Sequence, residues 1–160
     1  ETSMDEKFRL GMEYVTTELA WMIASDGEGA SRSIEVCVMN ARNEKDARIA
    51  ARTIAGSNLV KAAIFGRDPN WGRIAAALGY SGAVFDPRKI SITMQSERGT
   101  AELVKRGKPP KKKTLLKAKD VMRAKEVEII VNLAAGKASA TAWGCDLTYD
   151  YVRVNSRYTT

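Results

Sequence analysis

The spacing of apolar residues predicts that the chain begins with an amphipathic helix. Between Phe8 and Met22, apolar residues recur at alternating intervals of four and three, which places them on one face of an α-helix. Ser3 and Glu6 have the spacing of a capping box at the start of this helix. From 33 to 39 the pattern changes to strict alternation, which predicts a half-buried strand.

The pattern over the next forty residues favours a strand–helix–strand unit. Asn43 can cap a helix over 44–56, whose small apolar residues suit close packing on a sheet. The apolar run 59–66 predicts a buried strand. Asp68 and Pro69 then predict the cap and first position of another helix. This order of elements indicates an α/β fold in which helices lie across a sheet.

The second half of the chain alternates between predicted strands and helices. The small residues of 138–144 indicate a central strand that another layer approaches closely. Asp146 or Thr148 can cap a helix in the tail. The other predicted elements are a strand at 89–95, a possible hairpin near 100–105, a helix at 114–123 and a strand at 126–133.

Composition limits the class of protein and the chemistry. With 160 residues, 44% hydrophobic and 28% charged, the chain has the make-up of a globular domain. It has no apolar run of bilayer-spanning length and its start does not resemble a signal peptide, so we expect a cytoplasmic location. Cys37 and Cys145 have no CxxC spacing and are expected to be reduced, packed thiols. The absence of histidine excludes a Ser-His-Asp or Cys-His site built from this chain alone.

Much of the net charge of +7 lies in one loop, 105–113, which has the sequence KRGKPPKKK. Such a run is typical of a solvated loop and, less often, of a nucleic-acid contact. No aromatic residues that could stack on bases are interleaved with it, which disfavours a nucleic-acid partner.

Glu28 is the clearest candidate for a functional residue, because it lies between Gly27 and Gly29 just after the first helix. Loops of this kind position functional groups, and a carboxylate held there could orient an ammonium-bearing ligand. The alternative is a solvated acid in a helix-terminating turn. Asn155 and the terminal Thr160 could supply directed hydrogen bonds to a zwitterion, or could belong to a frayed chain end.

Several segments together resemble one known family. They are SDGEGAS (25–31), DPNWGRIAAALGYSG (68–82) and SATAWGCDLTYDYVRVN (139–155), with similar order and spacing. The chain resembles the ornithine acetyltransferase family, the bifunctional glutamate N-acetyltransferases of arginine biosynthesis, over nearly its whole length.

The resemblance implies a self-cleaving enzyme with an N-terminal threonine nucleophile. That threonine takes the acetyl group of N2-acetylornithine and passes it to glutamate. The nucleophile and the oxyanion donors are expected outside this chain, which would therefore contain no catalytic residue and be inactive alone. Glu28, Asn155 and Thr160 are implied to bind substrate, and no cofactor or metal is expected.

The resemblance also implies an architecture, a layered helix-sheet sandwich. Residues 1–30 would join the nucleophile-bearing part, and 31–160 would form a C-terminal α/β domain. Partners would be that upstream segment and a companion first chain, assembled as a heterotetramer. Arg67 or Arg73, and more weakly Lys61, are candidates for holding a substrate carboxylate.

Three questions stay open from the sequence. Acetyl-CoA could be a second acetyl donor. A related amidohydrolase or aminopeptidase, in which water accepts the acyl group, is a rival interpretation. A basic nucleic-acid-binding module that uses 105–113 is the non-enzymatic alternative.

Overall fold

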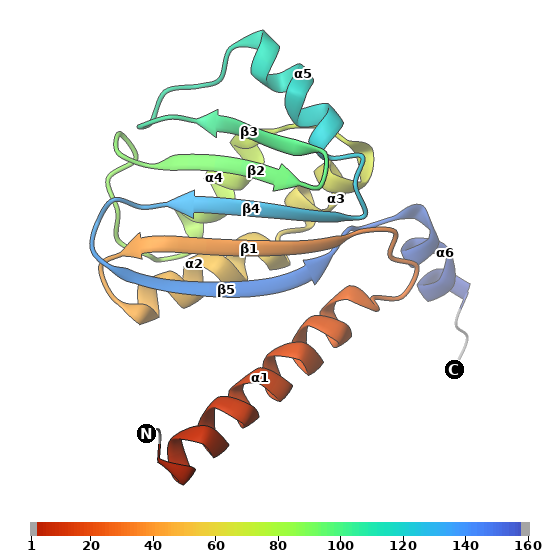
Figure 1. Ribbon diagram of the computed structural model, residues 1–160. Helices are drawn as coiled ribbons and strands as arrows, with labels where there is room; N and C mark the ends of the chain where they lie inside the picture. The colour runs from red at the N-terminus through yellow and green to blue at the C-terminus, as the bar shows by residue number, and fades with distance from the viewer. Residues whose placement is uncertain (1–2, 158–160) are drawn as a thin grey trace.

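A mixed five-stranded sheet forms the centre of the computed structural model, which describes residues 3–157 (Figure 1). The strand order is β3-β2-β4-β1-β5; β1 and β4 are parallel, and every other neighbouring pair is antiparallel. The α/β class predicted from the sequence is confirmed. The strands are β1 (Ser33–Ala41), β2 (Ser91–Ser96), β3 (Gly99–Val104), β4 (Glu126–Asn132) and β5 (Ala138–Cys145).

One face of the sheet carries the helices and the core. In Figure 1, α2 (Glu44–Gly56), α3 (Asn58–Gly66) and α4 (Trp71–Tyr80) lie together behind the strands, and α5 (Lys112–Val121) lies at the β3 edge. The predicted alternation of β1 is confirmed, because Ile34, Val36 and Val38 are buried on this face. The predicted stripe of α2 also packs here, and all of its members are fully buried: Ala47, Ala50, Ala51 and Ile54.

The other face of the sheet is not covered by any helix among the described residues (Figure 1). Polar side chains on this face form hydrogen bonds between neighbouring strands. The Trp143 indole N–H donates to Glu35 at 3.0 Å, and the Gln95 amide donates to Glu128. Glu35, Gln95 and Glu128, together with Trp21 of the first helix, line a hollow of about 440 Å³. The uncovered face is therefore half-buried and rich in carboxylates.

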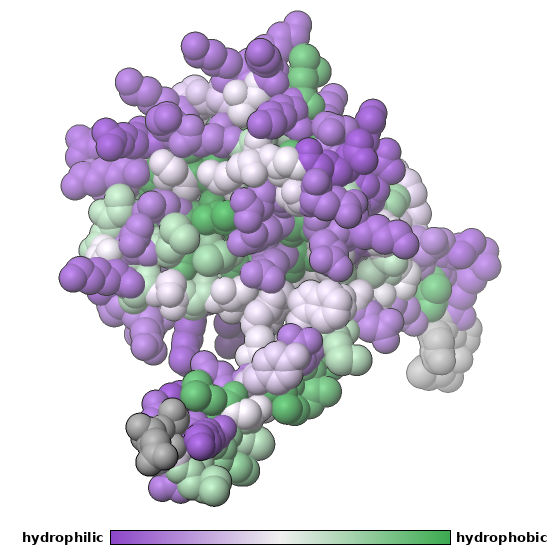
Figure 2. All heavy atoms as spheres, in the orientation of Figure 1, coloured by the Kyte–Doolittle hydropathy of each residue, from purple (hydrophilic) through white to green (hydrophobic). Residues whose placement is uncertain are grey.

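The first helix, α1 (Met4–Ser25), projects away from the sheet (Figure 1). Its predicted cap is confirmed, because the Ser3 hydroxyl accepts from the Glu6 amide at 3.2 Å. None of its residues is buried, and Figure 2 shows apolar side chains gathered along it. Its large apolar side chains are 49–81% exposed: Met4, Phe8, Leu10, Met12, Tyr14, Val15, Leu19, Met22 and Ile23.

The strand predicted at 59–66 is wrong, because this run forms helix α3. The Ser57 hydroxyl accepts from the Val60 amide and caps the helix, as a serine at this position commonly does. A short run that is apolar on all sides is equally compatible with a buried strand and a buried helix. The strand–helix–strand unit is therefore replaced by three consecutive helices between β1 and β2.

Two further details differ from the prediction. Helix α4 is capped at Asn70, without a side-chain hydrogen bond, rather than at Asp68; the Asp68 carboxylate accepts from the Asn70 side chain at 3.2 Å. Strand β5 is an edge strand rather than a central one. Its small residues do permit close approach, since a Cβ on Gly144 would lie 3.1 Å from the Ala55 carbonyl oxygen of α2.

The tail forms α6 (Tyr149–Arg157), and Thr148 provides the predicted cap. Thr160 lies outside the described residues. Cys37 and Cys145 are free thiols, and burial raises the pKa of Cys37 above its ordinary value. No helix within residues 3–157 has the length and apolar character needed to cross a membrane.

Candidate functional site

Glu28 and Asn155 meet although 127 residues separate them along the chain. The Asn155 side-chain amide donates to the Glu28 carboxylate at 2.8 Å and to the Tyr151 carbonyl at 2.9 Å. A carboxylate only accepts hydrogen bonds, so the amide nitrogen must face Glu28 and the amide oxygen is directed elsewhere. Both residues are exposed, so the pair is accessible from solvent.

Two glycines hold the loop that carries Glu28 close to its neighbours. A Cβ on Gly27 would overlap the Cys145 sulfur at the end of β5. Gly29 has φ +68°, and a Cβ there would lie 2.8 Å from the Tyr151 amide nitrogen at the start of α6. Since only glycine allows this approach at no steric cost, both neighbours of Glu28 are required for the position of the loop.

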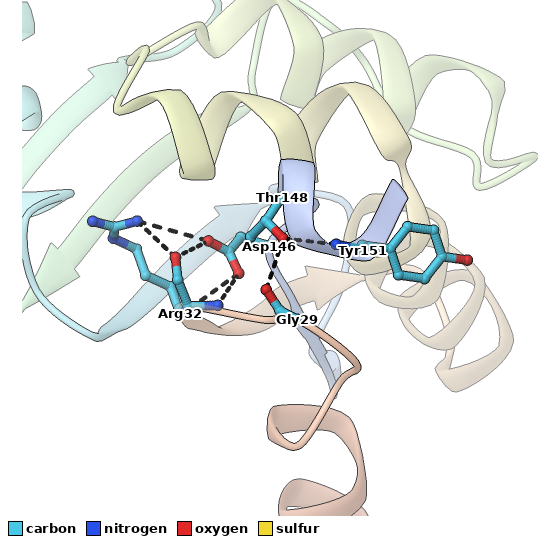
Figure 3. Close-up of polar contacts among 6 residues, drawn as sticks. Gly29, Arg32, Asp146, Thr148 and Tyr151 are labelled. Atoms are coloured by element: carbon cyan, nitrogen blue, oxygen red, sulfur yellow. Dashed lines mark hydrogen bonds and ion pairs between the residues drawn. The ribbon is translucent and has the colours of Figure 1, made fainter. Parts of the chain in front are cut away.

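Asp146 fixes the end of the same loop (Figure 3). The residue is 3% exposed, and its carboxylate accepts from the amides of Ser31 at 2.8 Å and Arg32 at 3.0 Å, as well as from the Ser31 hydroxyl. Arg32 adds an ion pair at 3.7 Å. The Arg32 side chain is only 10% exposed, and its Nε has no hydrogen-bond partner among the described residues. Asp146 is therefore the main counter-charge of a nearly buried arginine.

Thr148 links the loop to α6 (Figure 3). Its hydroxyl donates to the Gly29 carbonyl at 2.7 Å and accepts from the Tyr151 amide at 3.2 Å. The Tyr149 ring also packs edge-on against Phe65 of α3, with ring centroids 5.4 Å apart. The position of Asn155 relative to Glu28 is thus set by one buried threonine and one aromatic contact.

The basic candidates lie in different surroundings. The Arg73 guanidinium donates to the Leu59 carbonyl at 3.0 Å and so ties α4 to α3. Arg67 is exposed and ends α3 with φ 52°. Lys61 touches the site through its carbonyl, which accepts from the Leu147 amide at 3.3 Å. In residues 3–157, none of the three makes a hydrogen bond or ion pair with Glu28 or Asn155.

The pair offers one negative charge, on Glu28, and one amide group, on Asn155, held in a fixed direction. A carboxylate at this position attracts an ammonium group, and an amide oxygen can accept from an N–H of the same ligand. Within the described residues no cluster of three potential metal ligands occurs.

The sequence predicts for Asp146 and Thr148 only that one of them caps the tail helix. Their second partners, the loop at 29–32, lie more than a hundred residues earlier in the chain. A buried aspartate close to an arginine requires the fold to bring them together, so no local spacing signals it.

Comparison with known proteins gives a consistent result over the whole chain. The model of the ArgJ family matches residues 1–160. The chain is 55% identical over 160 residues to the glutamate N-acetyltransferase of Methanothermobacter thermautotrophicus, covering 98% of this chain and 40% of that protein. It is 52% identical over 153 residues to the arginine biosynthesis bifunctional protein ArgJ of Caldanaerobacter subterraneus subsp. tengcongensis, covering 96% of this chain and 38% of that one.

A solved structure has the same fold. The crystal structure of the arginine biosynthesis bifunctional protein argJ from Bacillus halodurans superposes with a TM-score of 0.86 at 41% identity. The match covers 95% of this chain and 70% of that chain. The chain spans about two fifths of the length of the curated relatives it matches.

Proposed function

Since the chain belongs to the ArgJ family, we propose that it forms a substrate-binding part of a glutamate N-acetyltransferase. The reaction would move the acetyl group of N2-acetylornithine to the amine of glutamate through an acetylated threonine. The observation that carries this proposal is the pairing of Glu28 with Asn155 at 2.8 Å. It joins the two described residues for which the family resemblance implies a substrate-binding role.

The chemistry of N2-acetylornithine fits this pair. Its α-amine is acetylated, so the one ammonium group it carries is at the end of its side chain. The Glu28 carboxylate would hold that ammonium, while Asn155 keeps the carboxylate in a fixed direction. Thr160 would contribute hydrogen bonds to the substrate. Arg67, Arg73 and Lys61 remain weaker candidates for the substrate carboxylate.

A charge-removing substitution at Glu28 tests this role. Glu28→Gln keeps the shape of the side chain but removes the charge that would pair with the ammonium. The expected result is a rise in KM for N2-acetylornithine of about 10- to 100-fold, since a hydrogen bond to a charged group contributes roughly 1.5–3 kcal/mol. Steady-state kinetics of acetylglutamate formation, in a preparation that contains the companion polypeptide, would measure it.

Glu44→Gln is the matched control. Glu44 is a surface acid at the start of α2 whose side chain is 77% exposed, and within residues 3–157 its one ion pair is with Arg48, at 3.7 Å. The control should leave KM unchanged. Equal KM values for Glu28→Gln and the unsubstituted protein would remove Glu28 from the site. Acyl transfer to water in place of glutamate would instead support the hydrolase alternative.

The proposal includes a polypeptide partner. The relatives are longer than this chain, and the exposed apolar stripe of α1 is the kind of surface that proteins bury at interfaces. We assign α1 and the loop after it, 1–30, to the junction with the nucleophile-bearing part, and 31–160 to the C-terminal α/β domain. The nucleophile and the companion first chain would complete a heterotetramer in the cytoplasm, with no cofactor.

Leu19→Lys tests the junction. Leu19 belongs to the apolar stripe and is 51% exposed in this chain, so a lysine there would place a charge in the proposed interface. The expected result is loss of the companion polypeptide from the complex in native mass spectrometry. Thr17→Lys, on the opposite side of α1, should leave the complex intact. Retention of the companion in both variants would contradict the assignment of α1.

A further inference from the structure

The basic loop 105–113 has no part in the proposed acetyl transfer. Residues 105–111 connect the end of β3 to α5, residues 112 and 113 begin α5, and Figure 1 places the segment at the other end of the molecule from α6. There it borders an open hollow of about 480 Å³. Four cationic side chains and one acidic side chain line this hollow, beside two prolines and a threonine: Lys105, Arg106, Lys108, Lys111, Glu102, Pro109, Pro110 and Thr114. A space of this size is in the range of small-molecule sites.

The turn that carries these side chains is firmly anchored. Lys105 and Lys108 exchange backbone hydrogen bonds of 3.1 and 3.0 Å, and the Gly107 amide donates to the Ile90 carbonyl at 2.8 Å. Gly107 has φ +70°, and a Cβ there would lie 2.7 Å from the Pro87 carbonyl oxygen. The cations of the loop therefore project from a fixed backbone rather than from a freely moving segment.

The start of α5 has the wrong charge for a helix N-terminus. Lys111 is the N-cap and makes no side-chain capping bond, Lys112 and Lys113 follow, and the first turn contains no acidic residue. Helix N-termini carry partial positive charge and favour anions, so three lysines here are unfavourable unless an anion lies among them. A sequence that breaks a local rule in this way often marks a functional site.

Most of these cations also lack an acidic partner. Lys105 pairs with Glu102 at 3.3 Å, whereas no described acid pairs with Arg106, Lys108 or Lys111. The nearby Arg88 is already engaged, because its side chain and amide donate to Asp86 at 3.0–3.1 Å and hold the pKa of that carboxyl below its ordinary value. The hollow therefore has a surplus of positive charge next to an uncapped helix.

We propose that this hollow binds a small anion with two or more phosphate groups, of the size of a nucleoside diphosphate. Phosphate oxygens match both the ammonium groups and the free amides of a helix N-terminus. A nucleic-acid strand fits less well, because no aromatic side chain lines the hollow and the cations surround a pocket rather than follow a groove.

Isothermal titration calorimetry tests the proposal. Pyrophosphate and ADP are titrated separately into the chain in complex with its companion polypeptide. Both probes should bind at low salt, and binding should weaken as salt rises. The double variant Lys108→Glu/Lys111→Glu should lower the affinity by about tenfold or more, since it removes two charge-assisted contacts. The control Lys45→Glu/Arg52→Glu makes the same change in net charge on α2 and should bind like the unsubstituted protein.

Three results would overturn the proposal. The first is that neither probe gives a heat of binding at low salt. The second is that the control variant loses as much affinity as Lys108→Glu/Lys111→Glu. The third is that a single-stranded oligonucleotide binds the loop without displacing either probe. Acetyl transfer should be unchanged in the Lys108→Glu/Lys111→Glu variant. Failure of the anion-site proposal can therefore be distinguished from failure of the proposed acetyltransferase function.

Discussion

Gly29→Ala is expected to lower kcat/KM for N2-acetylornithine by about 100-fold, the size of effect that a displacement of roughly 1 Å in a site can cause. The added Cβ would lie 2.8 Å from the Tyr151 amide nitrogen and 3.0 Å from the Asp150 backbone. The left-handed backbone adds about 1–2 kcal/mol and overpacking about 1–3 kcal/mol. The loop and α6 should therefore move apart, which would break the bond between Thr148 and the Gly29 carbonyl and separate Glu28 from Asn155.

Gly66→Ala is the control for this experiment. Gly66 ends α3 without a positive φ, and a Cβ there would meet no heavy atom within 4 Å. Steady-state kinetics and thermal unfolding of both variants should show a loss of activity for Gly29→Ala only. If Gly29→Ala retained its kcat/KM, the close approach of the loop to α6 would not matter for the site.

Asp146→Ala is expected to lower the free energy of unfolding by about 3–5 kcal/mol, the usual result of removing one partner of a buried ion pair. The substitution would leave the amides of Ser31 and Arg32 without their acceptor and the Arg32 guanidinium nearly buried without a counter-charge. Denaturant unfolding of the intact protein measures this change.

Two companion variants make that prediction specific. Asp150→Ala removes a nearby acid whose side chain is 60% exposed and pairs with Arg153 at 2.8 Å, and it should cost at most about 1 kcal/mol. Adding Arg32→Met to Asp146→Ala should recover part of the loss, because the unpaired charge is then absent. Equal stability of Asp146→Ala and Asp150→Ala would mean that Asp146 does not hold the loop.

The sequence predicts those parts of the fold that depend on local periodicity. The alternation in β1, the alanine stripe of α2 and the Ser3 cap of α1 each follow from spacing within one element, and each is found in the structure. The run 59–66 could not be assigned this way. Apolar residues occupy both buried positions, such as Val60 and Ile64, and the exposed position Leu59, so the sequence shows no period that would distinguish helix from strand.

The edge position of β5 depends on long-range pairing. Small residues indicate that another layer comes close, as α2 does at Gly144, but they do not show how many strands flank the segment. In the candidate site, too, some features follow from local sequence and others depend on long-range contacts. Two flanking glycines marked Glu28, whereas the roles of Asp146 and Thr148 depend on contacts across more than a hundred residues.

In the function proposed above, this chain binds substrate for an acetyl transfer whose nucleophile lies on another part of the enzyme. Intact-mass spectrometry of the native preparation, denatured after brief exposure to N2-acetylornithine, tests it most directly. A companion polypeptide should gain the mass of one acetyl group at an N-terminal threonine while this chain gains none. Acetylation of this chain, or acetylglutamate formation without any acetylated polypeptide, would contradict it.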